Sequence, residues 1–387
     1  MLGKKIKKLK NWLQGRRNLQ DFRVRLAVFK QHHSYQYQVV LISHELSATG
    51  APLMLLNAAK AILADGGSVR VLSCSDGPLR RQFEALGVPV FYHPGFRHQR
   101  KLLNEFACDC DYAVANTVIT YPAINLLKGP KVLWWIHEAQ VIDKDYIVRF
   151  RKKKIRPDLE QTLRQASKLA VVSDYAEEVV AKYNPKTEVI NLAVADVAAE
   201  KGLSAKEAGE KIRFAIIGAV CEIKGQDIVV EAVKMLPETY RKQAEFYIAG
   251  KQNNSFCDKL VAETKRVSEI VWLPALDFDT LWDFYRDCDV VMVASRDESF
   301  SLVTLEACMA SRPVIVSSNV GAKFLVKSGE NGEVFASGDA KSLCQAIISL
   351  IDKRNQLPEM GKLSRKQYEL SGTLENFYEK FLYLLKK

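Results

Sequence analysis

The sequence predicts an α/β protein built from two parallel-sheet domains in succession. Its 387 residues exceed what one hydrophobic core of ordinary size holds. Short apolar runs that are typical of buried strands recur in two separate series along the chain. Amphipathic stretches with helical spacing lie between these runs, and such alternation indicates parallel sheets that helices cover on both faces.

The first series forms a domain that we place at 31–196. Its expected strands are 39–42, 69–74, 88–92, 112–115, 132–136 and 169–172, and helical patterns between them include 52–64 and 79–86.

The second series forms a domain that we place at 213–371. Its expected strands are 214–218, 246–250, 270–273, 290–294 and 314–317, with helices near 227–235, 256–267, 280–285 and 302–309. The polar stretch 197–212, rich in Ala, Glu and Lys, is interpreted as a linker with room for a short exposed helix. Apolar residues at helical spacing predict a terminal helix at 372–387.

The formal net charge is +11, and most of the excess lies in a basic tail at 1–30. Ten Lys or Arg residues fall there, against the single acid Asp21. Between the lysines, apolar residues recur at helical spacing: Leu2, Ile6, Leu9 and Leu13. This pattern suits a helix lying on an anionic membrane surface, while docking on the protein's own domain or a disordered arm stay open. The tail lacks aromatic interleaving, so we expect no nucleic-acid partner.

The lengths of the apolar runs and the spacing of the cysteines indicate the cellular compartment of the protein. No run is long enough to span a bilayer, and the tail lacks the apolar core of a secretory signal. The eight cysteines show no CxxC spacing, which predicts buried free thiols rather than disulfides or a zinc site. We therefore expect a cytoplasmic protein, held peripherally on the inner face of the plasma membrane.

Two acidic residues, Glu298 and Glu306, stand where the strand 290–294 gives way to a helix. Open α/β sheets bind ligands beyond the carboxyl ends of their strands, and a helix N-terminus there offers N–H groups to a phosphate. Ser301 would cap this helix. The two carboxylates can accept hydrogen bonds from hydroxyls of a sugar and a ribose, which predicts a nucleotide-sugar site. The alternative is an exposed loop acid and a solvated helix position.

A lysine at a second strand-to-helix turn adds a cation. The strand 214–218 ends at Gly218, and Lys224 precedes the next helix together with Gly225. The charge of Lys224 can neutralise a diphosphate and stabilise a departing nucleotide. An exposed loop lysine is the alternative.

In the first domain, the loop after the first strand contains Thr49 and Gly50, where small residues let backbone approach a ligand. The glycine spacing does not fit a dinucleotide fingerprint. Asn116 and Thr117 follow another strand and can line a ligand site or serve as turn residues.

Two histidines of this domain are candidate site residues, and the sequence supports them unequally. His137 follows the strand 132–136 with Glu138 beside it, and a histidine there can equally satisfy a local backbone partner. His44 has no comparable support.

The segments ESFSLVTLEACMA at 298–310, RPVIVSSNVG at 312–321 and GENG at 329–332 strongly resemble the donor-binding segment of glycosyltransferase family 4, also called group 1. The resemblance implies the GT-B fold, with two Rossmann-like domains facing a central cleft and a C-terminal helix that crosses back to the first domain. It also implies sugar transfer with retention and without a metal ion.

Site roles follow from the resemblance, position by position. His137 contacts the transferred sugar and forms the catalytic group with Lys224 and Glu298. The donor-binding positions are Gly50, Gly218, Lys224, Glu298, Ser301, Leu302, Val303 and Glu306. On the acceptor side we place Thr49, Asn116 and Glu138. Ala219 stands where the family usually has an arginine, which leaves Lys224 as the only clear cation of the pair.

We therefore expect a retaining, metal-independent hexosyltransferase without a cofactor. It would move a sugar from a UDP- or GDP-type donor to a hydroxyl of a glycan or lipid-linked glycan in bacterial-type surface polysaccharide synthesis. The alternatives are a GT-B epimerase, which would release UDP without an acceptor, and a basic nucleic-acid-binding protein. One acidic tripeptide, Asp277-Phe278-Asp279, is placed to hold a metal, but we expect Asp279 to cap a helix from Thr280.

Overall fold

The computed structural model describes residues 20, 23–24, 27, 35–138, 142, 157–252, 254–265 and 267–387. Contacts divide the chain into two compact units. The first comprises Met1–Ile190 and Tyr378–Lys387, and the second comprises Asn191–Phe377. The apolar stripe of the expected interfacial helix at 1–30 lies outside the described residues.

The first unit is built on a seven-stranded parallel sheet. Its strands are β1 (Gln38–Ser43), β2 (Ser68–Ser73), β3 (Val90–Tyr92), β4 (Tyr112–Asn116), β5 (Lys131–Ile136), β6 (Lys168–Val171) and β7 (Thr187–Val189). They lie in the order β3-β2-β1-β4-β5-β6-β7. The central strands β1 and β4 are buried along nearly their whole length, because helices cover both faces of the sheet.

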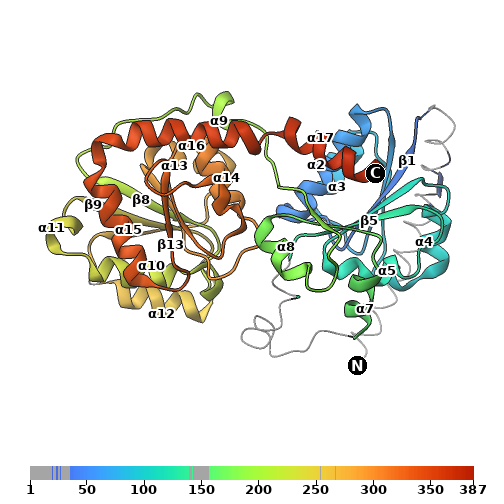
Figure 1. Ribbon diagram of the computed structural model, residues 1–387, viewed down its shortest axis with the longest axis horizontal. Coiled ribbons are helices and arrows are strands. Elements are labelled where there is room, and N and C mark those ends of the chain that lie inside the picture. The colour runs from blue at the N-terminus through green and yellow to red at the C-terminus, as the bar shows by residue number, and fades with distance from the viewer. Residues whose placement is uncertain are drawn as a thin grey trace. The chain divides into compact units, whose positions relative to one another are not determined.

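The connections of this sheet decide where its helices lie. The helices are α2 (Gly50–Ala64), α3 (Leu79–Ala85), η1 (Phe96–His98), α4 (Arg100–Ala107), η2 (Val118–Thr120), α5 (Tyr121–Ile124), α7 (Pro157–Gln165) and α8 (Asp174–Val180). Crossovers between parallel strands are right-handed, and the strand order reverses direction after β3. Accordingly α2 and α3 cover one face, while α4, α5 and α7 cover the other (Figure 1).

The second unit repeats this plan with a six-stranded parallel sheet in the order β10-β9-β8-β11-β12-β13. The strands are β8 (Ile212–Ile217), β9 (Ala244–Ala249), β10 (Ile270–Leu273), β11 (Val290–Val293), β12 (Val314–Ser317) and β13 (Gly332–Phe335). Both sheets confirm the predicted pair of Rossmann-like folds.

Helices again cover both faces of the second sheet. They are α9 (Val197–Glu200), η5 (Glu222–Lys224), α10 (Gln226–Met235), α11 (Glu238–Arg241), α12 (Ser255–Thr264), α13 (Phe278–Asp287), α14 (Leu302–Met309), η6 (Gly321–Leu325), α15 (Ala340–Asp352), η7 (Arg354–Gln356) and α16 (Leu357–Ser371). Figure 1 shows α13, α14 and α16 on one face and α10, α12 and α15 on the other. The apolar sides of α10, α12 and α15 enclose a core around Phe214, Phe246 and Ile315.

The sequence did not predict the last strand of either sheet. β7 has only three residues, and β13 begins at Gly332 and is buried only at its first and last residues. A Cβ at Gly332 would lie 1.9 Å from the Val314 carbonyl oxygen, so the glycine permits this pairing. Short edge strands lack the continuous apolar run that identifies the central ones.

The polar stretch after the first unit contacts the second unit throughout. The contact boundary falls at Ile190, ahead of the expected domain end at 196. Arg365 of α16 donates to Asp196 at 2.8 Å, and Arg312 donates to the Ser204 carbonyl at 2.9 Å. These contacts hold the stretch against the second unit, and α9 is the short helix within it.

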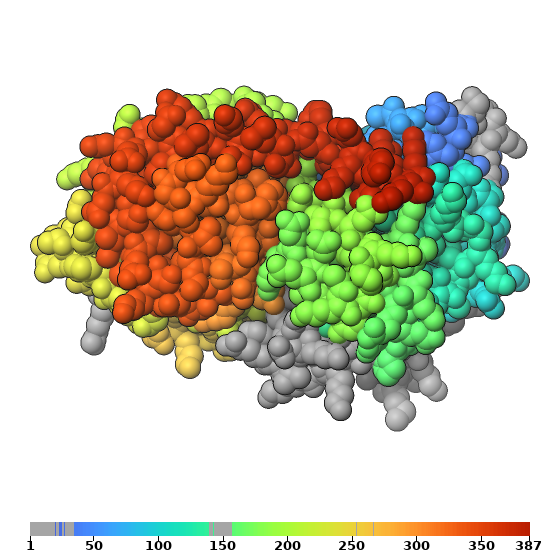
Figure 2. Space-filling view, in the orientation of Figure 1, coloured from blue at the N-terminus to red at the C-terminus, as the bar shows by residue number. Residues whose placement is uncertain are grey.

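The last helix, α17 (Leu374–Lys386), passes from one unit to the other. Its residues from Tyr378 onward belong to the first unit, which confirms the expected return of the terminal helix. Phe381 packs on Trp135 with ring centroids 5.8 Å apart, and the Leu385 carbonyl accepts from Lys168 at 3.1 Å. Figure 2 shows this red end of the chain directly against the green segment that contains α8.

All eight cysteines are free, which confirms the absence of disulfides that their spacing predicts. Burial was expected for all of them, but Cys108 is exposed and Cys74 and Cys221 are only partly buried. In the described part of the chain, no helix is long and apolar enough to cross a membrane.

Candidate functional site

Glu298 lies in the loop that joins β11 to α14, at the carboxyl edge of the second sheet. Its N–H donates to the Asn319 carbonyl at 3.0 Å, and its own carbonyl accepts from Gly321 at 2.9 Å. Its side-chain oxygens accept from Lys224 Nζ and from Ser295 Oγ, each at 2.6 Å. The carboxylate is therefore fixed in place, and a lysine balances its charge.

Lys224 reaches this carboxylate from η5, the turn between β8 and α10. Gly225 follows with φ of 72°, and a Cβ there would lie 2.1 Å from the Ala294 carbonyl oxygen. Only glycine fits so close to the end of β11. The structure thus brings Lys224 and Glu298, two predicted site residues, together.

Arg296 is a second cation at this edge that the sequence did not single out. Its guanidinium donates to the Asp227 carboxylate at 2.8 and 2.6 Å and to the Glu222 carbonyl at 2.5 Å. Hydrogen bonding to Asp227 raises the pKa of Arg296, so the pair stays ionised. Arg296 therefore ties the lysine turn to the acidic loop while its own charge is already balanced.

The N-terminus of α14 lies next to the acidic loop. Ser301 accepts the Thr304 N–H at 3.3 Å, which confirms it as the cap. Its φ is 103°, a value rare outside glycine and a source of backbone strain. Helix geometry leaves the N–H groups of Leu302 and Val303 without a partner inside the helix, so this turn can bind an anion.

Glu306 lies further along α14 and is partly buried. Its Oε2 accepts a hydrogen bond from the Tyr285 hydroxyl at 3.0 Å. Burial raises the pKa of Glu306 to about 7, although the hydrogen bond from Tyr285 acts to lower it. This carboxyl group is thus poised between its neutral and charged forms at neutral pH, unlike the solvated helix acid that the sequence left as an alternative.

The end of β8 completes this edge. Gly218 has φ of 136°, and a Cβ on Gly250 would lie 1.8 Å from the Gly218 carbonyl oxygen. The two glycines let the ends of β8 and β9 approach closely, which places Gly218 at the same sheet edge as Lys224.

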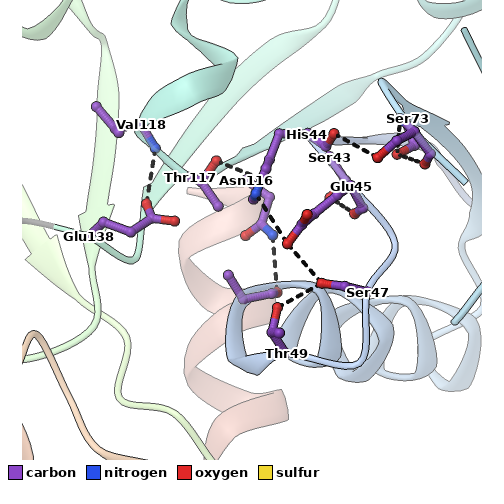
Figure 3. A network of polar contacts seen from close by, with 12 residues as sticks. Ser43, His44, Glu45, Ser47, Thr49, Ser73, Asn116, Thr117, Val118 and Glu138 are labelled. Carbon is purple, nitrogen blue, oxygen red and sulfur yellow. Dashed lines mark hydrogen bonds and ion pairs between the residues drawn. The ribbon is translucent and has the colours of Figure 1, made fainter. Parts of the chain in front are cut away.

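In the first unit, residues at the ends of neighbouring strands form a polar cluster (Figure 3). After β1, Ser47 Oγ lies 2.9 Å from Thr49 Oγ1 and donates to Glu45 Oε1 at 2.7 Å. At the end of β4, buried Asn116 donates to the Ala51 carbonyl at 3.0 Å, which joins this strand to the first turn of α2. Gly50 is the first residue of that helix.

The same cluster includes a histidine that the sequence gave no reason to select. His44 Nδ1 lies 3.1 Å from Thr117 Oγ1 at the end of β4. Glu138, after β5, accepts the Val118 N–H at 3.3 Å (Figure 3). No local sequence pattern places His44 beside Thr117, because the two are far apart in the chain.

His137 is buried at the end of β5, with its ring centroid 4.4 Å from that of Trp135. Among the described residues, neither ring nitrogen of His137 has a hydrogen-bond partner. Burial, and to a smaller extent His44, lowers the pKa of His137 to about 3. The ring is therefore neutral, and the structure as described gives it no backbone partner of the kind that the sequence left open.

The acidic tripeptide Asp277-Phe278-Asp279 lies at the start of α13. Within the described ranges, no group of three or more His, Cys, Asp or Glu residues is arranged to hold a metal. The expected cap at Asp279 is wrong, because α13 starts earlier and Asp277 accepts the Thr280 N–H at 2.9 Å. Asp279 instead pairs with Lys201 at 2.7 Å.

Curated relatives and solved structures share parts of this architecture. The chain is 33% identical over 162 residues to a lipopolysaccharide core biosynthesis mannosyltransferase, LpcC, of Rhizobium leguminosarum bv. viciae, covering 40% of this chain and 45% of the relative. It is 30% identical over 155 residues to an uncharacterized glycosyltransferase of Methanocaldococcus jannaschii, covering 39% and 42%. The chain thus spans less than half the length of these curated relatives.

Solved structures match over almost the whole chain. Anabaena HepE in complex with UDP and glucose superposes with a TM-score of 0.71 at 16% identity, covering 91% of this chain and 100% of that one. Sucrose-phosphate synthase from Thermosynechococcus elongatus gives 0.71 at 19% identity, covering 91% and 98%. At such identities the likeness is one of fold, the GT-B fold.

Two family models match consecutive parts of the sequence. The model for glycosyl-transferase family 4 matches residues 36–207, and the model for glycosyl transferases group 1 matches residues 199–367. Together they cover both sheets and both polar edges described above. The chain therefore belongs to the family 4, group 1 glycosyltransferases.

Proposed function

We propose that the protein transfers a sugar, with retention, from a nucleotide diphosphate-sugar to a hydroxyl of an acceptor. The observation that carries the proposal is the edge of the second sheet, where Lys224, Glu298 and the N-terminus of α14 meet. A nucleotide sugar carries a diphosphate beside neutral hydroxyls. The lysine and the N–H groups at the start of the helix suit the diphosphate, and the fixed carboxylates suit the hydroxyls.

Donor binding would exchange the partners of the ion pair. Lys224 and the N–H groups of Leu302 and Val303 turn to the diphosphate, and Glu298 accepts hydrogen bonds from the sugar hydroxyls. Glu306 accepts hydrogen bonds from the ribose. Ser295 continues to hold Glu298 in place during this exchange, through its 2.6 Å hydrogen bond.

In the chemical step, the bond between the anomeric carbon and the phosphate oxygen breaks, and its electron pair goes to the diphosphate. The acceptor hydroxyl forms the new bond on the same face, and its proton passes to the leaving phosphate oxygen. Lys224 lowers the barrier because negative charge grows on the diphosphate as the bond breaks. The neutral ring of His137 can hydrogen-bond the transferred sugar, which its buried, unpartnered nitrogens in the described structure support.

We assign the acceptor to the glycans or lipid-linked glycans of surface polysaccharide synthesis. The name of the Rhizobium relative, a lipopolysaccharide core mannosyltransferase, supports this assignment. The basic tail at 1–30 would hold the enzyme on the inner face of the plasma membrane. Deleting it should abolish sedimentation with anionic liposomes in moderate salt and leave nucleotide binding unchanged.

A thermal-shift panel of UDP, GDP, ADP and their sugars, with and without EDTA, tests the donor site. A ligand at a hundred times its Kd stabilises the fold by about 2.7 kcal/mol, and we expect one nucleotide class to do so in EDTA as well. The Glu298→Gln variant should lose the extra shift that the sugar gives over the bare nucleotide. Glu359→Gln, an exposed acid on α16, is the matched control. No shift with any nucleotide would refute the proposal, and nucleotide release without an acceptor would indicate an epimerase.

A further inference from the structure

A chain of hydrogen bonds in the first unit converges on one oxygen of Glu45 (Figure 3). Ser47 Oγ donates to Glu45 Oε1 at 2.7 Å, and Thr49 Oγ1 lies 2.9 Å from Ser47 Oγ. A hydroxyl has one proton, and that of Ser47 is used on the carboxylate. Thr49 must therefore donate to Ser47, so both hydroxyls point their protons toward Glu45.

His44 approaches the same oxygen from the other side. Its Nε2 lies 3.5 Å from Glu45 Oε1, and its Nδ1 lies 3.1 Å from Thr117 Oγ1. Burial lowers the pKa of His44 most, the charge of Arg97 lowers it further, and Glu45 acts to raise it. The net pKa is below the usual value, so the ring is neutral at neutral pH. A neutral ring has one N–H. In the tautomer with its proton on Nε2, the N–H lies on the side of the carboxylate and Nδ1 accepts the Thr117 hydroxyl proton.

Thr117 is held in a strained conformation to make this contact. Its φ of 76° and ψ of 161° are almost confined to glycine, and a β-branched residue there is an outlier. Its carbonyl accepts from Trp134 Nε1 at 2.9 Å and from Thr120 Oγ1 at 2.8 Å, while its N–H donates to Trp135 at 2.8 Å. These hydrogen bonds fix the backbone, and the hydroxyl faces His44.

The second oxygen of Glu45 is available to a ligand. In the described part of the chain no donor contacts Oε2, and the Glu45 side chain is 39% exposed. A partly exposed carboxylate, with one oxygen hydrogen-bonded by Ser47 and the other without a donor among the described residues, can accept hydrogen bonds from neutral hydroxyls and repels anions. We propose that Glu45 is an acceptor-binding residue whose Oε2 accepts a hydrogen bond from an acceptor hydroxyl, with His44 and Thr117 as its positioning residues.

This assignment rests on the proposed function, because it names the substrate class of the same reaction. The acceptor would present neutral sugar hydroxyls at this point rather than a phosphate or a carboxylate. Octyl glucoside, octyl galactoside and octyl mannoside, below their micellar concentrations, are suitable probes. Their binding to the full chain can be followed by saturation-transfer NMR without any turnover.

The wild type should bind at least one of these glycosides saturably. Glu45→Gln should weaken that Kd about ten- to a hundredfold, since hydrogen bonds to a charged group are the stronger kind. Thr117→Val, which keeps the shape and removes the hydroxyl, should weaken it severalfold, and Thr117→Ser should restore wild-type affinity. Glu178→Gln, an exposed acid on α8, is the matched control and should change nothing.

The thermal shift with nucleotide separates this inference from the proposed function. It should be the same in wild type, Glu45→Gln and Thr117→Val, which also shows that the variants are folded. If nucleotide does not stabilise the wild type against thermal unfolding, the proposed donor site is refuted and the role of Glu45 is not affected. Equal glycoside affinity in wild type and Glu45→Gln, or no glycoside binding by the wild type, would overturn the role of Glu45.

Discussion

The carboxyl edges of the two sheets are built alike in topology and differ in their electrostatics. At the second sheet, opposite charges meet at short distance, as in Lys224 with Glu298 at 2.6 Å and Arg296 with Asp227 at 2.6 Å. At the first sheet, hydroxyls, the neutral ring of His44 and the carboxylates of Glu45 and Glu138 form the cluster, and the buried neutral ring of His137 lies at the end of β5.

The difference teaches how each edge can meet its ligand. An ion pair can exchange its internal partners for ligand groups: the lysine turns to a charged phosphate, and the carboxylate, still held by Ser295, turns to polar hydroxyls. The hydroxyls, neutral rings and carboxylates of the cluster at the first sheet instead suit the uncharged hydroxyl groups of a sugar. The division agrees with a charged donor at the second sheet and a neutral sugar acceptor at the first.

The largest expected effect comes from removing the cation of the charged edge. Lys224→Ala should lower kcat about 10²- to 10³-fold, the range found when one stabilising group is lost from a transition-state charge. The KM for donor should change less, since the charge counts most as the bond breaks. Single-turnover kinetics at saturating donor measure this, with Lys259→Ala on α12 as an exposed control. Equal rates in variant and wild type would show that phosphate stabilisation lies elsewhere.

Removing the buried carboxyl of the second unit should have the next largest effect. Glu306→Ala should weaken nucleotide binding about ten- to a hundredfold, because hydrogen bonds to a charged acceptor contribute roughly 1.5 to 3 kcal/mol. Isothermal titration of the nucleoside diphosphate checks it. Affinity within twofold of the wild type, in a folded variant, would remove Glu306 from the site.

The neutral edge predicts an acid-sensitive first unit. The pKa of His137 is about 3 in the fold and about 6.5 when unfolded, so only the unfolded chain gains a proton between these values. This contribution to stability is present above pH 6.5 and falls by up to about 1.4 kcal/mol per pH unit below it. In urea unfolding at several pH values, the free energy of unfolding should fall less steeply with decreasing pH for His137→Gln than for wild type. Identical slopes would contradict the buried neutral ring.

The smallest expected effect concerns the hydrogen bond on Glu306. Burial raises the pKa of Glu306 to about 7 and Tyr285 opposes this, so nucleotide binding should strengthen as pH rises through 7. Tyr285→Phe should move that rise to higher pH, with a severalfold loss of affinity near pH 7. The free energy of unfolding should change in the opposite direction with pH. The pKa of Glu306 is higher in the folded than in the unfolded chain, so this group favours the folded state in acid, and that gain is lost as pH rises toward 7. A profile unmoved by Tyr285→Phe would mean that another group titrates.

Much of the charged edge could be predicted from sequence because its parts are local. Glu298, Ser301 and Glu306 lie within one loop and helix, and a strand-to-helix junction fixes their order along the edge. Lys224 could be added because it lies at the equivalent junction of a neighbouring strand. The Lys224–Glu298 pair itself needed the close approach that Gly225 permits.

The neutral edge resisted prediction because its contacts join distant segments. His44 contacts Thr117, which is 73 positions away in the chain. The contact also depends on the positive φ of Thr117, and nothing in the sequence around a threonine predicts that backbone conformation. The expected cap at Asp279 failed for a smaller reason, since helix α13 began two residues earlier than its apolar spacing indicated.

By itself, then, the amino-acid sequence determined the two parallel-sheet units, the resemblance to family 4 and most of the residues that meet at the carboxyl edge of the second sheet. These depend on periodicity and on neighbours along the chain, which hydrophobic burial and helix geometry translate directly into structure. Only the tertiary structure decided which charges are already paired, which carboxyl group is buried enough to titrate near neutrality, and which oxygen of Glu45 already accepts a hydrogen bond. Those properties arise from atoms brought together across the sheet, where desolvation and hydrogen-bond partners depend on packing rather than on sequence spacing.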